Sequence, residues 1–178
     1  MPKKIEIRIS GLGGQGVVLA GQILGRAAVY DGKNAVQTQS YGAEARGSAA
    51  KSEVIISDDK IGFPAVRKCD VLVAMSQTAV DKHLKDLKKD GTLIVDSGIV
   101  KNVPQTKAKL FRIPATKTAE TISGAKIGAN MIMLGALTSV TKIVSEKALK
   151  KSIEEAVALK TVDVNVRAFE RGLTLTTG

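Results

Sequence analysis

A glycine-rich loop near the amino terminus constrains the fold of this 178-residue chain more than any other feature. Ile5, Ile7 and Ile9 alternate with polar residues, which predicts a strand with one face less buried, and the strand runs into Gly11-Leu12-Gly13-Gly14-Gln15-Gly16. Apolar residues then recur at helical spacing until Asp31-Gly32, a typical helix end. The spacing G-x-G-x-x-G lets the backbone turn tightly and presents a helix N-terminus to a phosphate. The order strand, glycine loop, helix therefore favours an α/β fold.

The rest of the chain extends this pattern. Because strands joined through helices by short links need crossover connections, we expect a three-layer Rossmann-like α/β domain, residues 1–178, with a mainly parallel sheet and a helical C-terminal part. Ser76 is the expected N-cap of a helix that runs to about Lys89. Further strands are predicted at 34–38, 51–57, 71–75, 92–95 and 110–113, and later helices at 118–122, 130–144, 145–159 and 162–173.

The glycine loop lacks the usual companion of a dinucleotide site. The end of the second predicted strand, residues 36–40, has neither an acid for ribose hydroxyls nor an Arg for a 2′-phosphate, which weakens NAD or NADP binding. The glycines could instead allow close packing of helix on strand. The amide of Gln15 could contact a ligand or a partner loop, or it could cap its own helix.

A second loop, residues 40–48, has the composition of a binding loop. It places an aromatic residue, an acid and a base between glycines that free the backbone: Tyr41, Gly42, Glu44, Arg46 and Gly47. The alternative is a surface ion pair of Glu44 with Arg46 and a Tyr41 packed on the domain.

Composition excludes several kinds of chemistry. An iron–sulfur cluster or a structural zinc ion needs about four ligands, whereas the chain has one Cys and one His. His83 lies in a lysine-rich stretch, away from any glycine-framed Ser or Cys, which argues against an independent hydrolase. We expect His83 to be an exposed helix residue and Cys69 a small buried apolar one. Asp96-Ser97-Gly98, after a predicted strand, is interpreted as a turn.

The net charge of +10 is partly regional, since Lys101, Lys107, Lys109, Arg112 and Lys117 lie between residues 97 and 119 without an acid among them. No aromatic residues interleave with these cations to stack on bases. We therefore favour a solvated face, an acidic partner or a polyphosphate ligand over nucleic acid. Without a signal-like N-terminus or a long apolar run, the chain is expected to be cytoplasmic, with no membrane span.

Taken together, the two loops and several later segments resemble the gamma subunit of 2-oxoacid:ferredoxin oxidoreductases over almost the whole chain. Tyr41 before Gly42 places the resemblance nearest the 2-oxoglutarate branch; Gly47 is followed by Ser48 where many members have a second glycine. The residues that carry the resemblance are 11–16, 40–47, Ser57-Asp58, Ile61, 70–74, Ser76-Gln77, Asn130 and Leu134-Gly135-Ala136.

The resemblance implies a noncatalytic subunit of an enzyme that converts a 2-oxoacid and coenzyme A into an acyl-CoA and carbon dioxide and passes two electrons to ferredoxin. It implies alpha, beta and delta-type partner subunits that carry thiamine diphosphate, magnesium and iron–sulfur clusters, with none bound by this chain alone. Coenzyme A is expected at most at the assembled interface. The implied cofactor or interface residues are Gly11, Gly13, Gly14, Gln15, Gly16, Tyr41, Gly42, Glu44, Arg46, Gly47, Ser76 and Asn130. The alternative is a free-standing nucleotide-binding protein or an NAD(P)-dependent dehydrogenase.

Overall fold

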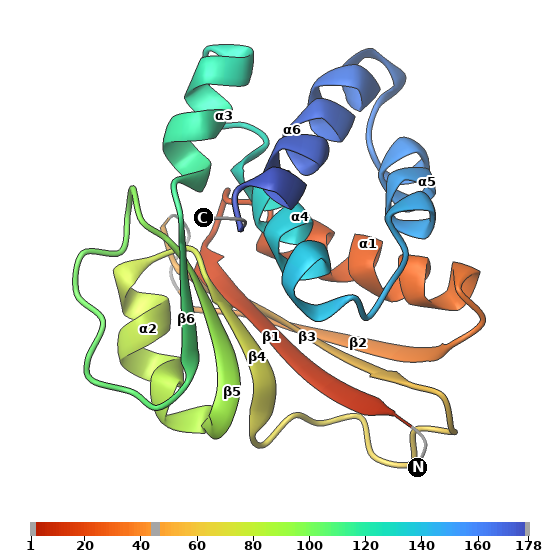
Figure 1. The fold of residues 1–178 in the computed structure, drawn as a ribbon, viewed down its shortest axis with the longest axis vertical. Coiled ribbons are helices and arrows are strands. Elements are labelled where there is room, and N and C mark those ends of the chain that lie inside the picture. Colours follow the sequence, from red (N-terminus) through yellow and green to blue (C-terminus); the bar gives the residue numbers. More distant parts are fainter. Residues whose placement is uncertain (1–2, 44–46, 177–178) are drawn as a thin grey trace.

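A six-stranded sheet runs through the centre of the molecule (Figure 1). The structure is a computed structural model that describes residues 3–43 and 47–176. The strand order is β2-β3-β1-β4-β5-β6, and β3 runs antiparallel to both of its neighbours, whereas β1, β4, β5 and β6 pair in parallel. The predicted mainly parallel sheet is therefore confirmed, with one reversed strand. The strands are β1 Lys4–Leu12, β2 Asn34–Tyr41, β3 Ala49–Ser57, β4 Cys69–Ala74, β5 Leu87–Asp96 and β6 Lys109–Ile113.

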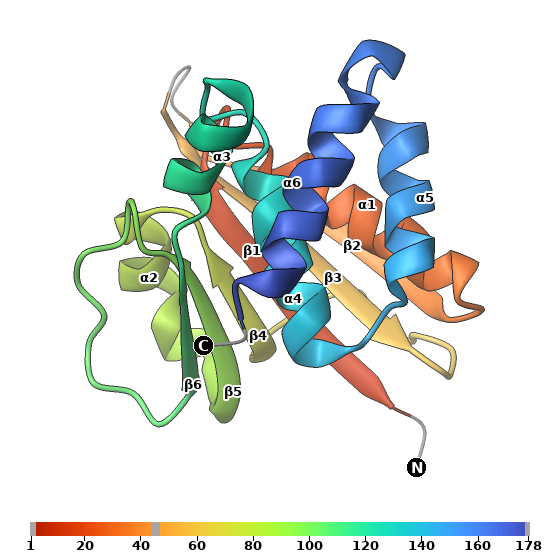
Figure 2. The ribbon, with the colours of Figure 1, turned by 45° about the horizontal axis from the view of Figure 1, so that its top comes forward.

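Helices lie on both faces of this sheet, as the predicted three layers require. Helices α1, α3, α4, α5 and α6 lie on one face, and the short helix α2 lies on the other (Figures 1 and 2). The predicted helical C-terminal part is also confirmed, because α4, α5 and α6 follow one another after β6 and α3. The helices are α1 Val17–Tyr30, α2 Gln77–His83, α3 Ala115–Ser123, α4 Ala129–Thr141, α5 Glu146–Ala156 and α6 Val162–Thr174, with 3-10 turns η1 Leu84–Asp86 and η2 Leu159–Thr161.

Some predicted element boundaries were wrong. The helix expected to reach Lys89 ends at His83, and residues 87–89 begin β5, because the buried Leu87 pairs with Cys69 across the sheet. The second strand continues to Tyr41 and β3 begins at Ala49, so residues 39–41 and 49–50, expected in the loop, belong to paired strands. Backbone pairing with β3 holds these polar residues extended, and their side chains carry no period-two signal for it.

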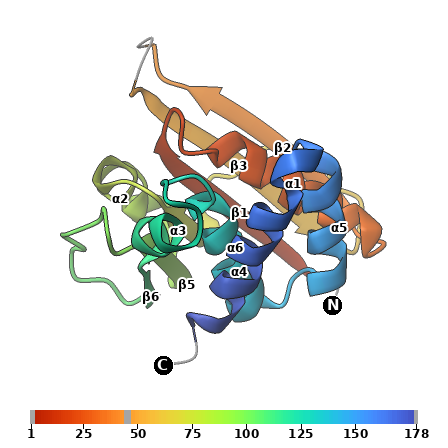
Figure 3. The same ribbon diagram turned by 90° about the horizontal axis from the view of Figure 1, so that it is seen from above.

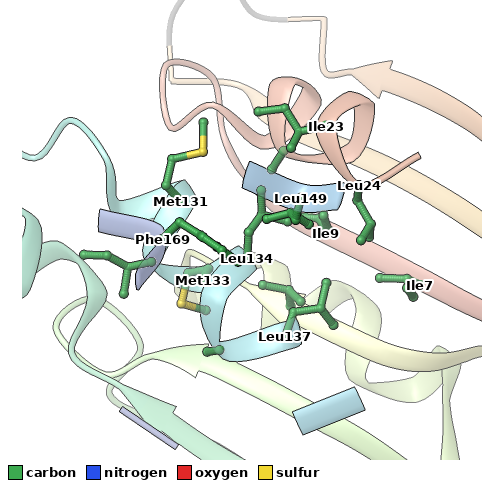
Figure 4. Packing of buried hydrophobic residues seen from close by; sticks show 14 of the residues in the cluster. Ile7, Ile9, Ile23, Leu24, Met131, Met133, Leu134, Leu137, Leu149 and Phe169 are labelled. Atoms are coloured by element: carbon green, nitrogen blue, oxygen red, sulfur yellow. The ribbon is translucent and has the colours of Figure 1, made fainter. Parts of the chain in front are cut away.

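The main core lies between the sheet and the five-helix face (Figure 4). Helix α4 is buried along most of its length and packs closely on α6. At this crossing, a Cβ on Gly135 would collide with the backbone of Phe169, and one on Gly172 with the backbone of Ile132. Glycine at both positions therefore lets the two helices approach at backbone distance.

On the opposite face, Arg8 makes a buried polar cluster under α2. Its guanidinium, only 4% exposed, donates to Glu53 Oε1 and Asp86 Oδ2, both at 2.8 Å, and to the carbonyl of Val66. The expectation of a less buried polar face on β1 was thus wrong at Arg8, whose charge is compensated by two carboxylates. His83 was also not the exposed residue expected: it is half-buried, with Nδ1 3.4 Å from Arg8 Nη1. Burial, and then the Arg8 charge, lower the pKa of His83 to about 4.

Candidate functional site

A cleft of about 770 Å³ opens where β1, β4 and β5 end at the carboxyl edge of the sheet. Open α/β sheets bind their ligands at this edge. Three short segments form most of the wall: the glycine loop at 14–16, residues 126–130 where the link from α3 enters α4, and residues 156–158 where α5 ends. Seen from above, α1, α4 and α6 converge over this end of the sheet (Figure 3).

The glycine loop takes a conformation that requires glycine at two positions. Gly14 and Gly16 have φ values of 89° and 72°, in the left-handed region that favours glycine. A Cβ on Gly14 would meet nothing within 4 Å, so this residue presents bare backbone to the cleft. Gly13 N donates to the carbonyl of Ser48 at 2.8 Å, which ties the loop to the start of β3.

The side-chain amide of Gln15 stabilises the glycine loop through two hydrogen bonds within the chain. Its Oε1 accepts from Leu12 N at 2.6 Å, and its Nε2 donates to the carbonyl of Met75 at 2.8 Å. Both amide atoms are therefore hydrogen-bonded within the chain, and the expected cap on α1 is not formed, because α1 has no side-chain cap hydrogen bond. Gly11 belongs to the same arrangement, because a Cβ there would collide with Gln15 Oε1.

Asn130, in the first turn of α4, connects the two helix N-termini that face the cleft. Its Nδ2 donates to the carbonyl of Gly16 at 3.2 Å, and its Oδ1 accepts from Met131 N at 3.0 Å. A Cβ on Gly16 would collide with this amide. The structure thus brings together Gly14, Gln15, Gly16 and Asn130 as lining residues of one cleft.

The other candidate residues lie outside the cleft wall. Ser76 is the confirmed N-cap of α2: its buried Oγ accepts from Ala79 N at 3.1 Å. Tyr41 is 62% exposed at the end of β2, next to Gly42, whose N donates to the carbonyl of Ala49. Gly47 has a φ of 63°. Glu44 and Arg46 lie outside the described residues.

Sequence reasoning missed several lining residues. Lys126 and Ile127 stand at the cleft mouth, and Ile127 is 69% exposed; Thr116 and Val157 line the wall. Apart from Gly124 and Gly128, which flank an exposed basic and apolar pair, nothing in the sequence pattern distinguishes these residues.

The cleft offers binding groups and no acid–base or metal chemistry of its own. Among the described lining residues there is no His, Cys, Asp or Glu, and Lys126 is the one cation. Asp96 lies nearby with its buried carboxylate occupied by Gly98 N, Thr116 N and Thr116 Oγ1, which confirms the predicted turn. No group of three or more His, Cys, Asp or Glu residues within 3–43 and 47–176 could hold a metal ion.

Known proteins resemble this chain in sequence and in fold. A family model described as pyruvate ferredoxin/flavodoxin oxidoreductase matches residues 6–175. The chain belongs to this family. The resemblance seen in the sequence is therefore confirmed: the chain is a subunit of a 2-oxoacid:ferredoxin oxidoreductase complex, and the alternative of a free-standing dehydrogenase is not supported.

Individual relatives support the family assignment of this oxidoreductase subunit. The subunit is 51% identical to the 2-oxoglutarate synthase subunit KorC of Methanocaldococcus jannaschii, over 94% of this chain and 91% of KorC. The keto/oxoacid ferredoxin oxidoreductase gamma subunit of Geobacter sulfurreducens matches in structure with a TM-score of 0.86 and 44% identity, over 97% and 98% of the two chains. The fold also matches 31% of a longer chain, 24% identical with a TM-score of 0.89, in the 2-oxoglutarate:ferredoxin oxidoreductase of Magnetococcus marinus. In the described part of this subunit, no helix is long and apolar enough to cross a membrane.

Proposed function

We propose that this chain is the gamma subunit of a 2-oxoglutarate:ferredoxin oxidoreductase. The reaction consumes 2-oxoglutarate and coenzyme A, releases succinyl-CoA and carbon dioxide, and passes two electrons to ferredoxin. The observation that carries the substrate assignment is the 51% identity to KorC, compared with 36% to the pyruvate synthase subunit PorC of the same organism. Both alignments cover more than nine tenths of each chain, so the difference in identity does not come from a difference in aligned length.

The proposed division of labour places the chemistry on other subunits. The cleft has no His, Cys, Asp or Glu among its described lining residues, and Lys126 is its one cation. Oxidative decarboxylation needs a carbanion-stabilising cofactor and a one-electron relay. We assign thiamine diphosphate with magnesium, and the iron–sulfur clusters, to alpha, beta and delta-type partners. The single cysteine, buried as Cys69, supports a cytoplasmic location for the assembly.

The cleft itself is proposed to hold part of coenzyme A once the partners are in place. Its walls are mostly apolar and would suit the pantetheine arm, while bare backbone at Gly14 and the N-terminus of α4 would face a phosphate. Coenzyme A carries a diphosphate and a 3′-phosphate, and Lys126 alone does not balance them. Partner subunits would have to supply further cations, which supports a coenzyme A site at an interface rather than on this chain alone.

The second loop is proposed to contact a partner subunit. Tyr41 stands 62% exposed beside Gly42, and the Gly13–Ser48 hydrogen bond couples this end of the hairpin to the glycine loop. Large exposed aromatic side chains are common anchors of protein interfaces. A contact at Tyr41 would therefore also position the loop that borders the cleft.

The test compares coenzyme A binding by the lone chain and by the purified complex. Titration calorimetry is expected to show binding to the complex and none to the lone chain at 100 µM ligand, roughly the KM range of such substrates. In the complex, Lys126→Ala is expected to raise the KM for coenzyme A about tenfold and leave the KM for 2-oxoglutarate unchanged. Lys147→Ala, an exposed cation on α5, is the matched control. Equal KM values in both variants would rule out the cleft as part of the coenzyme A site.

A further inference from the structure

The two edges of the sheet differ sharply in charge. Strand β2 forms one edge with eight residues, none of which is charged. Strand β6 forms the other edge with five residues, of which Lys109 and Arg112 are exposed cations. The β6 edge therefore carries two cations and no acid, whereas the β2 edge carries no charge.

The cations at this edge continue beyond the strand. Lys107 precedes β6 and Lys117 lies in the first turn of α3 just after it, and both are exposed. We call Lys107, Lys109, Arg112 and Lys117 the cationic stripe. Residue 109 shares a face of the strand with Phe111, which packs against the main core, whereas residue 112 shares the opposite face with Leu110. The stripe thus flanks the free edge on both faces of the sheet.

The stripe is not neutralised within the chain. None of its four side chains forms an ion pair with any acidic residue in the described ranges 3–43 and 47–176. Elsewhere, by contrast, Lys51, Lys88 and Lys150 each have a carboxylate partner. The sequence between residues 97 and 119 contains no Asp or Glu that could approach.

The backbone of β6 is also available on its outer side. Among the described residues, its backbone partners are β5 and Ser97, which directly follows β5. Figures 1 and 3 show β6 at the margin of the sheet, opposite β2. An unpaired strand edge is a template for a further strand, and charged side chains beside it exclude partners of like charge.

We propose that the β6 edge docks an extended acidic segment of another subunit of the oxidoreductase, which adds a strand to the sheet and places its carboxylates against the cationic stripe. The proposal rests on the membership of this chain in a multisubunit enzyme, and not on its substrate. The free backbone edge supplies hydrogen bonds, and the unneutralised charge selects an acidic occupant. Nucleic acid is disfavoured because Phe111, the one aromatic side chain at this edge, is partly buried against the core and lies under the Lys109 ammonium, 5.2 Å from its ring centre.

The direct test is zero-length cross-linking of the purified complex with a carbodiimide, which joins lysine amines to carboxylates in contact, followed by peptide mass spectrometry. Links from Lys107, Lys109 or Lys117 to acidic residues of one segment of another subunit are expected. An intact complex in which these lysines form no intersubunit link, while other lysines do, would overturn the proposal.

A variant pair supplies a second, independent readout. The triple variant Lys107→Glu, Lys109→Glu, Arg112→Glu is expected to bind the remaining subunits about tenfold more weakly or worse, since several opposed charges change sign. The control triple Lys85→Glu, Lys89→Glu, Lys147→Glu has the same net charge and exposed sites outside the stripe. It should assemble like the wild type, and circular dichroism should show that both variants are folded.

Three outcomes count against the proposal. Equal weakening in both triples would mean that only net charge matters, and equal assembly of both would mean that the stripe is an uninvolved surface. Retention of duplex DNA by the lone wild-type chain at 150 mM salt, lost in the first triple, would assign the stripe to nucleic acid. Failure of the wild-type chain to join any such complex would instead contradict the proposed function.

Discussion

The Nδ2 atom of Asn130 donates to the carbonyl oxygen of Gly16 at 3.2 Å, across 114 residues of sequence. This bond joins the first turn of α4 to the residue before α1, so the two helices that border the cleft are held in one geometry. Two features favour glycine at position 16: the backbone φ is positive, and the Asn130 amide occupies the space that a Cβ would need.

Gly16→Ala should therefore be more destabilising than another alanine at a positive φ. Gly32 has a φ of 75° and open space around it, so Gly32→Ala reports the backbone strain alone, about 1 kcal/mol. Gly16→Ala adds the collision with Asn130 and should cost about 3 kcal/mol. Urea denaturation measures both free energies of unfolding. Equal losses would mean that Asn130 does not constrain this site.

Gln15→Glu should loosen the glycine loop. The substitution replaces the Nε2 donor with a carboxylate oxygen facing the carbonyl of Met75, 2.8 Å away in the wild type. The lost hydrogen bond and the new repulsion should lower the free energy of unfolding by about 2 kcal/mol at pH 7. The exposed Gln105→Glu makes the same charge change outside the loop and should be nearly neutral. An unchanged free energy of unfolding in Gln15→Glu would show that the hydrogen bonds of Gln15 do not stabilise the loop.

The half-buried His83 should make the fold sensitive to mild acid. Its pKa in the folded chain is lowered to about 4, whereas an unfolded His titrates near 6.5. Between these values the unfolded chain binds more protons, so stability falls as pH drops from 6.5 toward 4, by roughly 1 kcal/mol or more. His83→Gln should flatten this part of the stability profile measured by denaturation from pH 7 to 4.5. An unchanged slope in the variant would show that other groups cause the loss.

The contact between α4 and α6 should tolerate no side chain at Gly135. A Cβ there would meet the carbonyl oxygen of Phe169, and backbone cannot rotate away as a flexible side chain can. Gly135→Ala should cost about 3 kcal/mol in spite of the better helix propensity of Ala. Gly62→Ala, in open space without a positive φ, should be neutral or slightly stabilising. A thermal unfolding comparison in which the two variants match would refute the close crossing.

Much of this fold could be predicted from residues that are close together in the sequence. The strand, glycine loop and helix at the amino terminus and the Ser76 cap follow from residues close together in sequence. The reversed direction of β3 could not be predicted, because its apolar run also suits a parallel strand. The length of β5 depends on Leu87 pairing with Cys69, a contact that no local pattern reports.

The candidate site was predictable only in part. The glycine loop was found from its spacing and Asn130 from the family resemblance, yet their hydrogen bond depends on the packing of α4 against α1. The hydrogen bonds of Gln15 to Leu12 and Met75 could not be predicted, since an amide in a loop can bind groups of its own chain or of another molecule equally well. Lys126 and Ile127 line the cleft because the fold places the link between α3 and α4 beside it, and no local sequence pattern reports this placement.

In the proposed function, this chain is a required, noncatalytic subunit of a 2-oxoglutarate:ferredoxin oxidoreductase. The most direct measurement is reduction of methyl viologen by the partner subunits, purified with and without this chain, in the presence of coenzyme A and either 2-oxoglutarate or pyruvate. Activity is expected only when the chain is present, with 2-oxoglutarate preferred over pyruvate. Full activity of the partners without this chain would show that it is not required, and a preference for pyruvate would refute the proposed substrate.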